Sequence, residues 1–179
     1  MQNIIIDEQL RLAPLRDVHA PGLFTLIEEN RSYLRQWLPW LDANTTQDHV
    51  TAFTRDAHKR NADFRGMVQA ILVEDQIAGV CGYNFIDQTN RWGELGYWLA
   101  ASHQGKGIVT RCAQAQVAYA ERNLNVHRTS ISVATQNTGS RAIAERLNFQ
   151  FEGILRDCEW LYDHYVDHAV YARLSTDPL

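Results

Sequence analysis

The chain has 179 residues, of which 45% are hydrophobic and 21% are charged, as in an ordinary globular protein. This length suits a single domain covering residues 1–179. The formal net charge of -4 argues against a nucleic-acid partner, because such partners favour a basic surface. No apolar run approaches the ~18–20 residues of a membrane span, and the first residues lack a signal-peptide pattern, so we expect a cytoplasmic protein with no membrane partner. The three cysteines are odd in number and far apart, which favours free thiols.

The first third of the chain predicts a strand followed by helices. Residues 4–16 predict a strand that ends near Pro14. Residues 19–40 carry apolar side chains at helical intervals, which predicts two helices with a break between them. A further helix is expected over residues 46–61, where apolar side chains recur at steps of three and four.

After Gly66 the pattern changes from helix to strand. Three strands joined by short turns predict an antiparallel meander, at residues 67–74, 76–87 and 93–100. A helix over residues 106–124 then leads to a strand at 127–135, a crossover that predicts a parallel pair. A short helix and two closing strands follow at residues 140–147, 149–155 and 166–174. Together these elements predict an α/β fold with a mixed sheet flanked by helices.

The stretch HQGKGIVT, residues 103–110, lies between a predicted strand and a predicted helix. A Walker A loop requires a glycine where Ala100 stands and a serine or threonine where Gly107 stands, and a dinucleotide fingerprint requires a third glycine where Thr110 stands. Both motifs therefore fail. A glycine-rich helix start can still bind a phosphate or pyrophosphate through its free backbone N–H groups. A plain glycine turn before a helix explains the same residues.

Two tracts, ELGYWLAASHQGKGIVT and TQNTGSRAIAERLNFQFEG, resemble the GNAT superfamily of acyl-CoA-dependent N-acetyltransferases, and within it the RimJ/RimL type, which modifies protein N-termini. The resemblance covers roughly residues 8–174. The family's N-x-x-S tract is matched by Asn137 and Ser140, with Asn148 where a glycine is usual. The resemblance implies the GNAT fold, a mostly antiparallel mixed sheet with a splayed parallel pair. The pyrophosphate loop, Q/R-x-x-G-x-G/A, is matched by Gln104, Gly105, Lys106, Gly107 and Ile108, while Val109 replaces the last small residue.

The resemblance implies acetyl-CoA as co-substrate and no metal. The loop from Gln104 to Val109 is expected to hold the pyrophosphate, and Lys106 or Arg111 to meet a phosphate. The pantetheine arm is expected to pair like an added strand with the backbone of Tyr97, Trp98 and Leu99, where an N–H near Trp98 or Leu99 can donate to the thioester oxygen. Asn137 either holds the pantetheine amide or forms an Asx-type turn at the strand exit.

Direct attack by the amine requires a base for the amine and a proton donor for the leaving thiolate. The resemblance implies Ser140 as the donor, although a helix-capping serine explains the same position. It implies Glu159, between the closing strands, as the base, with an exposed loop glutamate as the alternative. Glu94 is the second candidate for the base. An α-amine, with a pKa of about 7.7–8, needs less help from a base than a lysine at about 10.4.

The remaining candidates are a histidine pair, considered as metal ligands, and two aromatic clusters. His164 and His168 stand four apart, but four strand residues span about 13 Å, too far for two ligands of one metal ion. An aromatic cluster in the predicted helix pair, and a second one between the closing strands, either belong to the core or line the acceptor groove. These aromatic residues are Tyr33, Trp37, Trp40, Trp160 and Tyr162.

The expected acceptor is the α-amine of a protein N-terminus, and a ribosomal stalk protein is the first named candidate. A small amine, such as a polyamine, an aminoglycoside or an aminoacyl compound, is the alternative within the enzyme class. A domain that binds acyl-CoA without turnover, as a sensor, is the alternative from another class. A homodimer is compatible with the resemblance.

Overall fold

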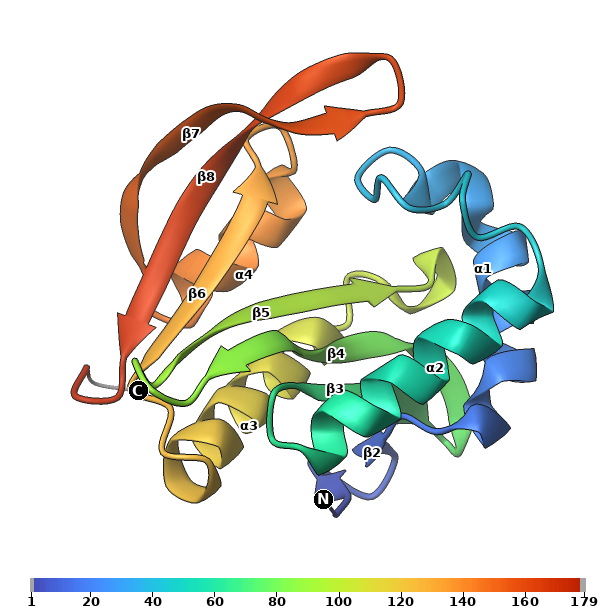
Figure 1. Cartoon of the computed structure of the whole chain (residues 1–179), viewed down its shortest axis with the longest axis horizontal. Coiled ribbons are helices and arrows are strands. Elements are labelled where there is room, and N and C mark those ends of the chain that lie inside the picture. The colour runs from blue at the N-terminus through green and yellow to red at the C-terminus, as the bar shows by residue number, and fades with distance from the viewer. Residues whose placement is uncertain (1, 178–179) are drawn as a thin grey trace.

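The computed structural model describes residues 2–177, and its centre is an eight-stranded sheet with the order β1-β2-β3-β4-β5-β6-β8-β7 (Figure 1). Every neighbouring pair is antiparallel except β5 and β6, which are parallel. The strands are β1 (Ile4–Ile5), β2 (Leu10–Pro14), β3 (Met67–Val73), β4 (Gln76–Asp87), β5 (Trp92–Leu99), β6 (Arg128–Ala134), β7 (Gln150–Leu161) and β8 (His164–Leu174). The helices are α1 (Ala20–Leu34), α2 (Gln47–Ala62), α3 (Ile108–Asn123) and α4 (Thr138–Arg146).

The single strand predicted at residues 4–16 is two strands, because a local turn interrupts it. The carboxylate of Asp7 accepts hydrogen bonds from the backbone N–H groups of Gln9 and Leu10, both at 2.8 Å. Such an Asx-type turn reverses the chain within a few residues. β1 therefore folds back on β2 in an antiparallel pair.

The second of the two helices predicted within residues 19–40 is absent: α1 ends at Leu34, and residues 35–46 form turns. Pro39 disfavours helical backbone at the residue before it. The guanidinium of Arg31 also donates to the carbonyls of Leu41 and Asn44, at 2.6 and 2.8 Å, which holds this turn segment against α1. The helix predicted at residues 46–61 is confirmed as α2.

The parallel pair forms a fork. β5 and β6 pair only through Trp92–Glu94 and Arg128–Ser130, and then diverge (Figure 1). At the closed end, the hydroxyls of Tyr83 and Thr129 share a hydrogen bond of 2.6 Å that joins β4 to β6. A Cβ on Gly93 would lie 2.7 Å from the Tyr83 ring, so the missing side chain lets that ring pass over β5. The splay predicted from the resemblance is therefore present.

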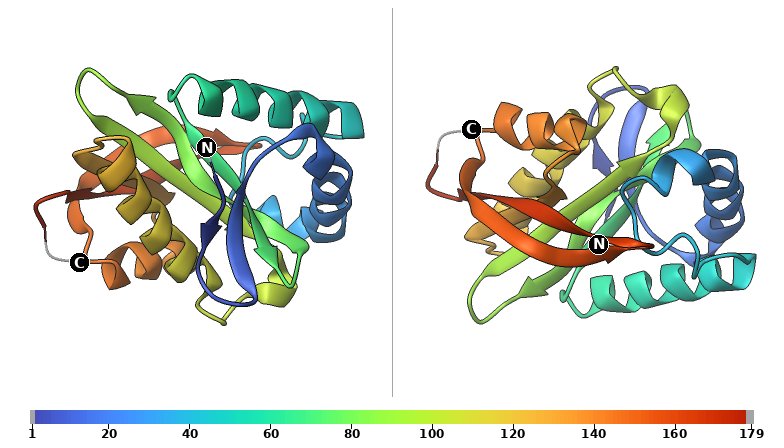
Figure 2. Two further views of the ribbon diagram at one scale, coloured as in Figure 1. Left: turned by 90° about the horizontal axis from the view of Figure 1, so that it is seen from below. Right: turned by 90° about the horizontal axis from the view of Figure 1, so that it is seen from above.

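Two buried apolar clusters cover the two faces of the sheet. One combines α1 and α2 with β3 and β4, and contains Leu23, Ile27, Val50 and Val68. The other packs α3 and α4 against the opposite face, and contains Cys112, Val117 and Ala144. Figure 2 shows α3 and α4 gathered on one side of the molecule, with α1 and α2 on the other. Both clusters extend to the fork, so side chains from both layers reach its opening.

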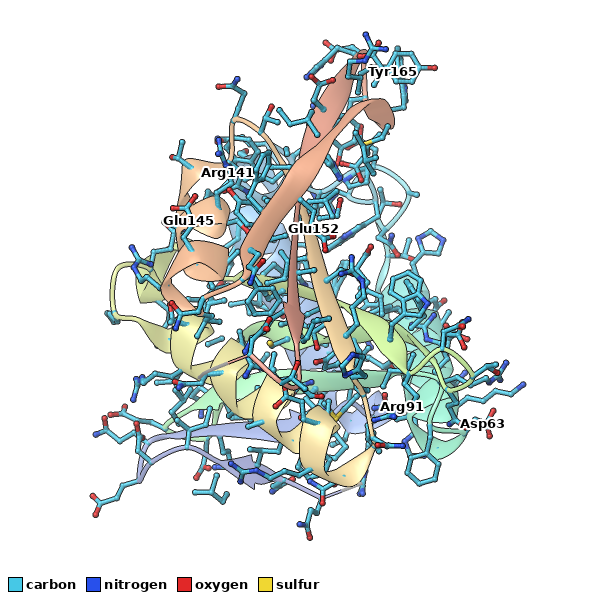
Figure 3. All side chains as sticks on the ribbon, turned by 90° about the vertical axis from the view of Figure 1, so that its left-hand side faces the viewer. Asp63, Arg91, Arg141, Glu145, Glu152 and Tyr165 are labelled. Atoms are coloured by element: carbon cyan, nitrogen blue, oxygen red, sulfur yellow. The ribbon has the colours of Figure 1, made fainter. Side chains whose placement is uncertain are left out.

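The closing hairpin is longer than predicted. β7 continues past residue 155 to Leu161, and Tyr162 and Asp163 form its turn; Figure 3 shows Tyr165 at the outer tip, with Arg141 and Glu145 on α4 below. A bulge between Leu155 and Glu159 interrupts the pairing with β8. Glu159 therefore lies on a strand, opposite Val166, and the alternative of an exposed loop glutamate is wrong.

No helix within residues 2–177 is both long enough and apolar enough to cross a membrane.

Candidate active site

The opening of the fork is a cleft of about 1580 Å³. It is bordered by the loop before α3, the first turn of α4, the diverging halves of β5 and β6, and the inner side of the hairpin. The cleft gathers nearly all of the candidate residues. Those that line it are Tyr33, Trp37, Trp40, Glu94, Tyr97, Trp98, Leu99, Gln104, Gly105, Lys106, Gly107, Ile108, Val109, Asn137, Ser140 and Glu159.

The glycine loop has a backbone that only glycine adopts readily. Gly105 and Gly107 have φ angles of +72° and +68°. A Cβ at either position would meet nothing within 4 Å, so the backbone angle, and not crowding, explains the glycines. Gly107 is the N-cap of α3, and no side chain caps this helix. The N–H groups of its first turn are therefore free for an anion, with the positive end of the helix dipole behind them.

The residues around the loop suit an anion as well. The first turn of α3 carries no acidic side chain, and Lys106 is exposed beside it. Arg111 is paired with Asp7, so that arginine is partly engaged within the chain. Ile108 is buried in the core under α3, and Val109 packs against the same cluster. The side chain of Val109, which departs from the small residue of the family pattern, therefore packs against the core.

The edge of β5 offers backbone groups to the fork. The N–H of Ala100 donates to Ala78 on the β4 side at 2.8 Å, and the carbonyl of Trp98 lies over Gly79, also on that side. Because backbone direction alternates along a strand, the N–H and C=O of Tyr97 and Leu99 point the opposite way, into the fork. Of the two N–H groups considered for the thioester oxygen, geometry favours that of Leu99.

Ser140 faces β5 across the cleft. Its hydroxyl donates to the Tyr97 hydroxyl at 3.0 Å, and that hydroxyl donates to the Ser140 carbonyl at 3.2 Å. Burial raises the pKa of Tyr97 to about 12, so its proton stays in place at neutral pH. The alternative of Ser140 as the helix cap is wrong: Asn137 is the N-cap, and its side-chain oxygen accepts from the Ser140 N–H at 3.1 Å.

The hairpin side of the cleft carries a polar cluster. Nε2 of His168 lies 3.3 Å from a carboxylate oxygen of Glu159, and Nδ1 lies 2.9 Å from the Ser132 hydroxyl. Glu94 on β5 lines the same cleft. Burial raises the pKa of Glu94 above its ordinary value; the nearby Glu159 raises it too, and His168 lowers it. Two carboxylates and one imidazole therefore share one side of the cleft.

Three of the aromatic candidates, Tyr33, Trp37 and Trp40, line the cleft, and Trp160 does not. Tyr33 accepts a hydrogen bond from the Gln104 amide, and burial raises its pKa. Trp37 and Trp40 lie in the turn segment after α1, not on a helix, and the Trp40 ring packs 6.4 Å from that of Trp98. Trp160 does not line the cleft: it is 52% exposed and packs against Tyr165 at the tip of the hairpin.

Tyr162 joins the hairpin to the turn segment. Its hydroxyl donates to the Leu38 carbonyl and accepts from the Leu41 N–H at 3.2 Å, and the Arg35 guanidinium stacks 3.7 Å above its ring. These contacts connect the two walls of the cleft at the end opposite the glycine loop. Tyr162 also packs against the buried cluster under α1 and α2, as the core interpretation predicts, and its hydroxyl adds a bridge between the hairpin and the turn segment.

Sequence reasoning missed Ser132, and it considered His168 only as a metal ligand. Residues 2–177 contain no group of three or more His, Cys, Asp or Glu side chains arranged to hold a metal ion. The available signal was alternation on β8: His168 precedes Ala169 and Tyr171, which are buried. That pattern places His168 on the face opposite these core residues, toward the cleft.

A family model for the acetyltransferase (GNAT) domain matches residues 9–150, well over half of the chain. The chain belongs to the GNAT acetyltransferase family. This GNAT chain is 32% identical to the ribosomal-protein-serine acetyltransferase of Escherichia coli strain K12, over 97% of each chain. The predictions of the GNAT fold and of an N-acetyltransferase are confirmed.

Solved GNAT structures are closely similar. RimL, a ribosomal alpha-N-protein acetyltransferase in complex with coenzyme A, has a TM-score of 0.92 and 30% identity, and the match covers 96% of this chain and 97% of that one. MccE, a microcin C7 self-immunity acetyltransferase in complex with acetyl-CoA and AMP, has a TM-score of 0.90 and 27% identity, with 94% of both chains covered.

Proposed function

We propose that this enzyme transfers an acetyl group from acetyl-CoA to the α-amine of a protein N-terminus, with a ribosomal protein as the first candidate acceptor. One observation carries the proposal. A single cleft brings together an uncapped helix start with two glycines at positive φ, the Ser140 hydroxyl and the Glu159 carboxylate. The likeness to the Escherichia coli enzyme and to RimL supports the choice of acceptor. We further propose that the enzyme acts in the cytoplasm.

The residues present fit acetyl-CoA. The free N–H groups after Gly107 suit a pyrophosphate, and the edge of β5 at Tyr97 and Leu99 suits a peptide-like arm. The co-substrate supplies the acetyl group as a thioester. Ser140, on α4, lies across the fork from this edge, which supports it as the proton donor to the leaving sulfur.

In the proposed reaction the chain's own residues position groups and move protons. Glu159 accepts the proton of the amine, directly or through water, and the Leu99 N–H donates to the thioester oxygen as negative charge develops on it. Ser140 donates its proton to the thiolate and regains one from solvent, while Glu159 releases its own. The Tyr97 hydroxyl, within hydrogen-bond distance, orients that serine. No covalent enzyme intermediate is required, because the amine is itself the nucleophile.

An aminoacyl small molecule is the second candidate acceptor. The similarity to MccE, which was solved with AMP beside acetyl-CoA, favours it specifically. The acceptor half of the cleft, between the turn segment and the hairpin, decides between the two. The third candidate, an acyl-CoA sensor without turnover, predicts binding of acetyl-CoA and no release of thiol.

Release of free thiol from acetyl-CoA tests these candidates, with a panel of N-terminal peptides, aminoacyl nucleotides, polyamines and aminoglycosides. Peptide-dependent release supports our proposal, and release with aminoacyl nucleotides alone supports the second candidate. Thermal stabilisation by CoA without release from any amine supports the sensor. Mass spectrometry of cell-extract proteins after incubation with labelled acetyl-CoA then identifies the acceptor as one dominant N-terminal product.

Replacing Gly107 by Ala weakens CoA binding by about 10-fold, because a Cβ disfavours the positive φ by roughly 1–2 kcal/mol and so favours a loop geometry other than the one proposed to bind the pyrophosphate. Isothermal titration with CoA measures the change. Gly153→Ala is the matched control: this glycine also has a positive φ, of +154°, and it does not line the cleft. Equal CoA affinity in the wild type and in both variants would contradict the proposal that the glycine loop binds the pyrophosphate.

Replacing Ser140 by Ala lowers kcat about 10-fold or more, because the thiolate loses its proton donor. Since Asn137 caps α4, the free energy of unfolding changes little in this variant. Asn137→Ala should show the reverse pattern, with a stability loss of about 1 kcal/mol from the missing cap. Steady-state kinetics and urea unfolding of both variants make the comparison. A Ser140→Ala enzyme with unchanged kcat would remove the serine from the mechanism.

We also propose a homodimer. Two exposed apolar side chains on the edge strand β7, Phe151 and Ile154, support it, since neither lines the cleft. Sedimentation velocity measures the association state, and a monomer at micromolar concentration would refute it.

A further inference from the structure

The cluster on the hairpin side of the cleft comes from three neighbouring strands. Ser132 lies on β6, His168 on β8 and Glu159 on β7, and these strands are adjacent in that order. The side chains of His168 and Glu159 are 15% and 27% exposed. The imidazole therefore lies between a hydroxyl and a carboxylate, largely shielded from water.

Both ring nitrogens of His168 have partners, which restricts the protonation of the ring. The Ser132 hydroxyl can donate to Nδ1, and this contact places the proton of the neutral ring on Nε2. Nε2 faces the Glu159 carboxylate, which only accepts hydrogen bonds when ionised. The protonated ring also donates from Nε2. In both of these states His168 is a hydrogen-bond donor to Glu159.

A second carboxylate lies close to this donor. Glu94 faces the same space from β5, where burial, and to a lesser extent the nearby Glu159, raise its pKa. The ionisable groups that face the ring are Glu159 from β7 and Glu94 from β5, and the neutral Ser132 lies on β6. The contact from Nε2 holds the Glu159 carboxylate in place beside Glu94.

The bulge in β7 contributes to this arrangement. Asp157 has a φ of +48°, and its N–H donates to the Asp167 carboxylate at 2.9 Å. Leu155 pairs with His168 and Glu159 with Val166, so the bulge adds two residues to β7 between these pairs. Beyond the bulge, Glu159 lies opposite Val166, and its carboxylate reaches His168, two residues farther along β8. Bulges often redirect a side chain in this way beside active sites.

We propose that His168 is a positioning residue for the acetyl transfer: it donates from Nε2 to one oxygen of Glu159, Ser132 fixes its ring, and the other oxygen of Glu159 is left for the acceptor amine. This inference rests on the proposed function, in which Glu159 is the base. It identifies what holds that carboxylate in place with one oxygen free for the amine.

Kinetics of three variants test the proposal. His168→Leu removes the donor and lowers kcat/KM for an N-terminal peptide by about 10-fold, with the KM for acetyl-CoA unchanged. His168→Gln keeps an N–H near the position of Nε2 and recovers most of the lost rate. In the Glu159→Gln background, His168→Leu causes no further loss, because its effect passes through the carboxylate.

Several outcomes would overturn the proposal. If His168→Leu keeps the wild-type kcat/KM, or if its loss simply multiplies with that of Glu159→Gln, His168 does not act through Glu159. Nitrogen-15 NMR of the ring is independent of activity, and a neutral ring protonated on Nδ1 would refute the contact. A wild-type protein that acetylates no amine would instead refute the proposed function, which separates the two failures.

Discussion

Turnover of an N-terminal peptide falls about 100-fold or more when Glu159 is replaced by Gln, measured at a pH near 6.5. At that pH most of the peptide's α-amine is protonated, because its pKa is about 7.7–8, and attack requires the base to remove a proton. The loss shrinks as pH rises above 8, where the amine is already neutral. The pH–rate profile of kcat therefore changes shape and does not merely drop.

Two variants serve as controls for this result. Trp160→Ala changes the next residue on β7, which lies outside the cleft, and should leave the profile intact. Glu94→Gln tests the second candidate for the base. A larger loss in Glu94→Gln than in Glu159→Gln would exchange their roles, and an unchanged profile in Glu159→Gln would exclude it as the base. CoA affinity should remain at the wild-type value in all three proteins.

The glycine loop, the meander and the crossover were predictable because their signals are local. Positive φ angles at Gly105 and Gly107, and a helix that begins directly after them, follow from residues adjacent in sequence. The meander and crossover follow from alternation, short turns and one helical repeat. The resemblance to the family then supplied the splay of β5 and β6, which no local pattern encodes.

The polar cluster could not be predicted, because it depends on how distant strands lie together. Ser132, Glu159 and His168 meet only because β6, β8 and β7 are neighbours and a bulge redirects β7. The bulge itself carries no glycine. Asp157 adopts the positive φ, and an aspartate in a sequence does not by itself predict that conformation. The prediction of a second helix within residues 19–40 was wrong for a similar reason. Arg31 holds residues 35–46 in turns through hydrogen bonds that hydrophobic periodicity does not reveal.

Replacing Arg173 by Met lowers the free energy of unfolding by about 3–5 kcal/mol. Arg173 is 2% exposed, and its guanidinium pairs with Glu121 on α3 and donates to the Asp177 carbonyl at 2.9 Å. It lies on β8 opposite Thr129, at the closed end of the fork. Its removal leaves the Glu121 carboxylate, whose side chain is 15% exposed, without its counter-charge. Since domains are typically stable by only about 5–15 kcal/mol, this loss is large.

The double variant Arg173→Met with Glu121→Leu distinguishes a buried charge from lost packing. If the cost of the single variant comes from the unpaired carboxylate, the double variant recovers most of the stability, because two apolar side chains can replace a buried ion pair. Urea unfolding measures both proteins, and equal m-values show that the same surface is exposed in each. A double variant as unstable as Arg173→Met would mean that the arginine acts through packing and its bond to Asp177. In either case CoA binding at the open end of the fork should persist below the unfolding transition, because the glycine loop and β5 contribute no atom to this pair.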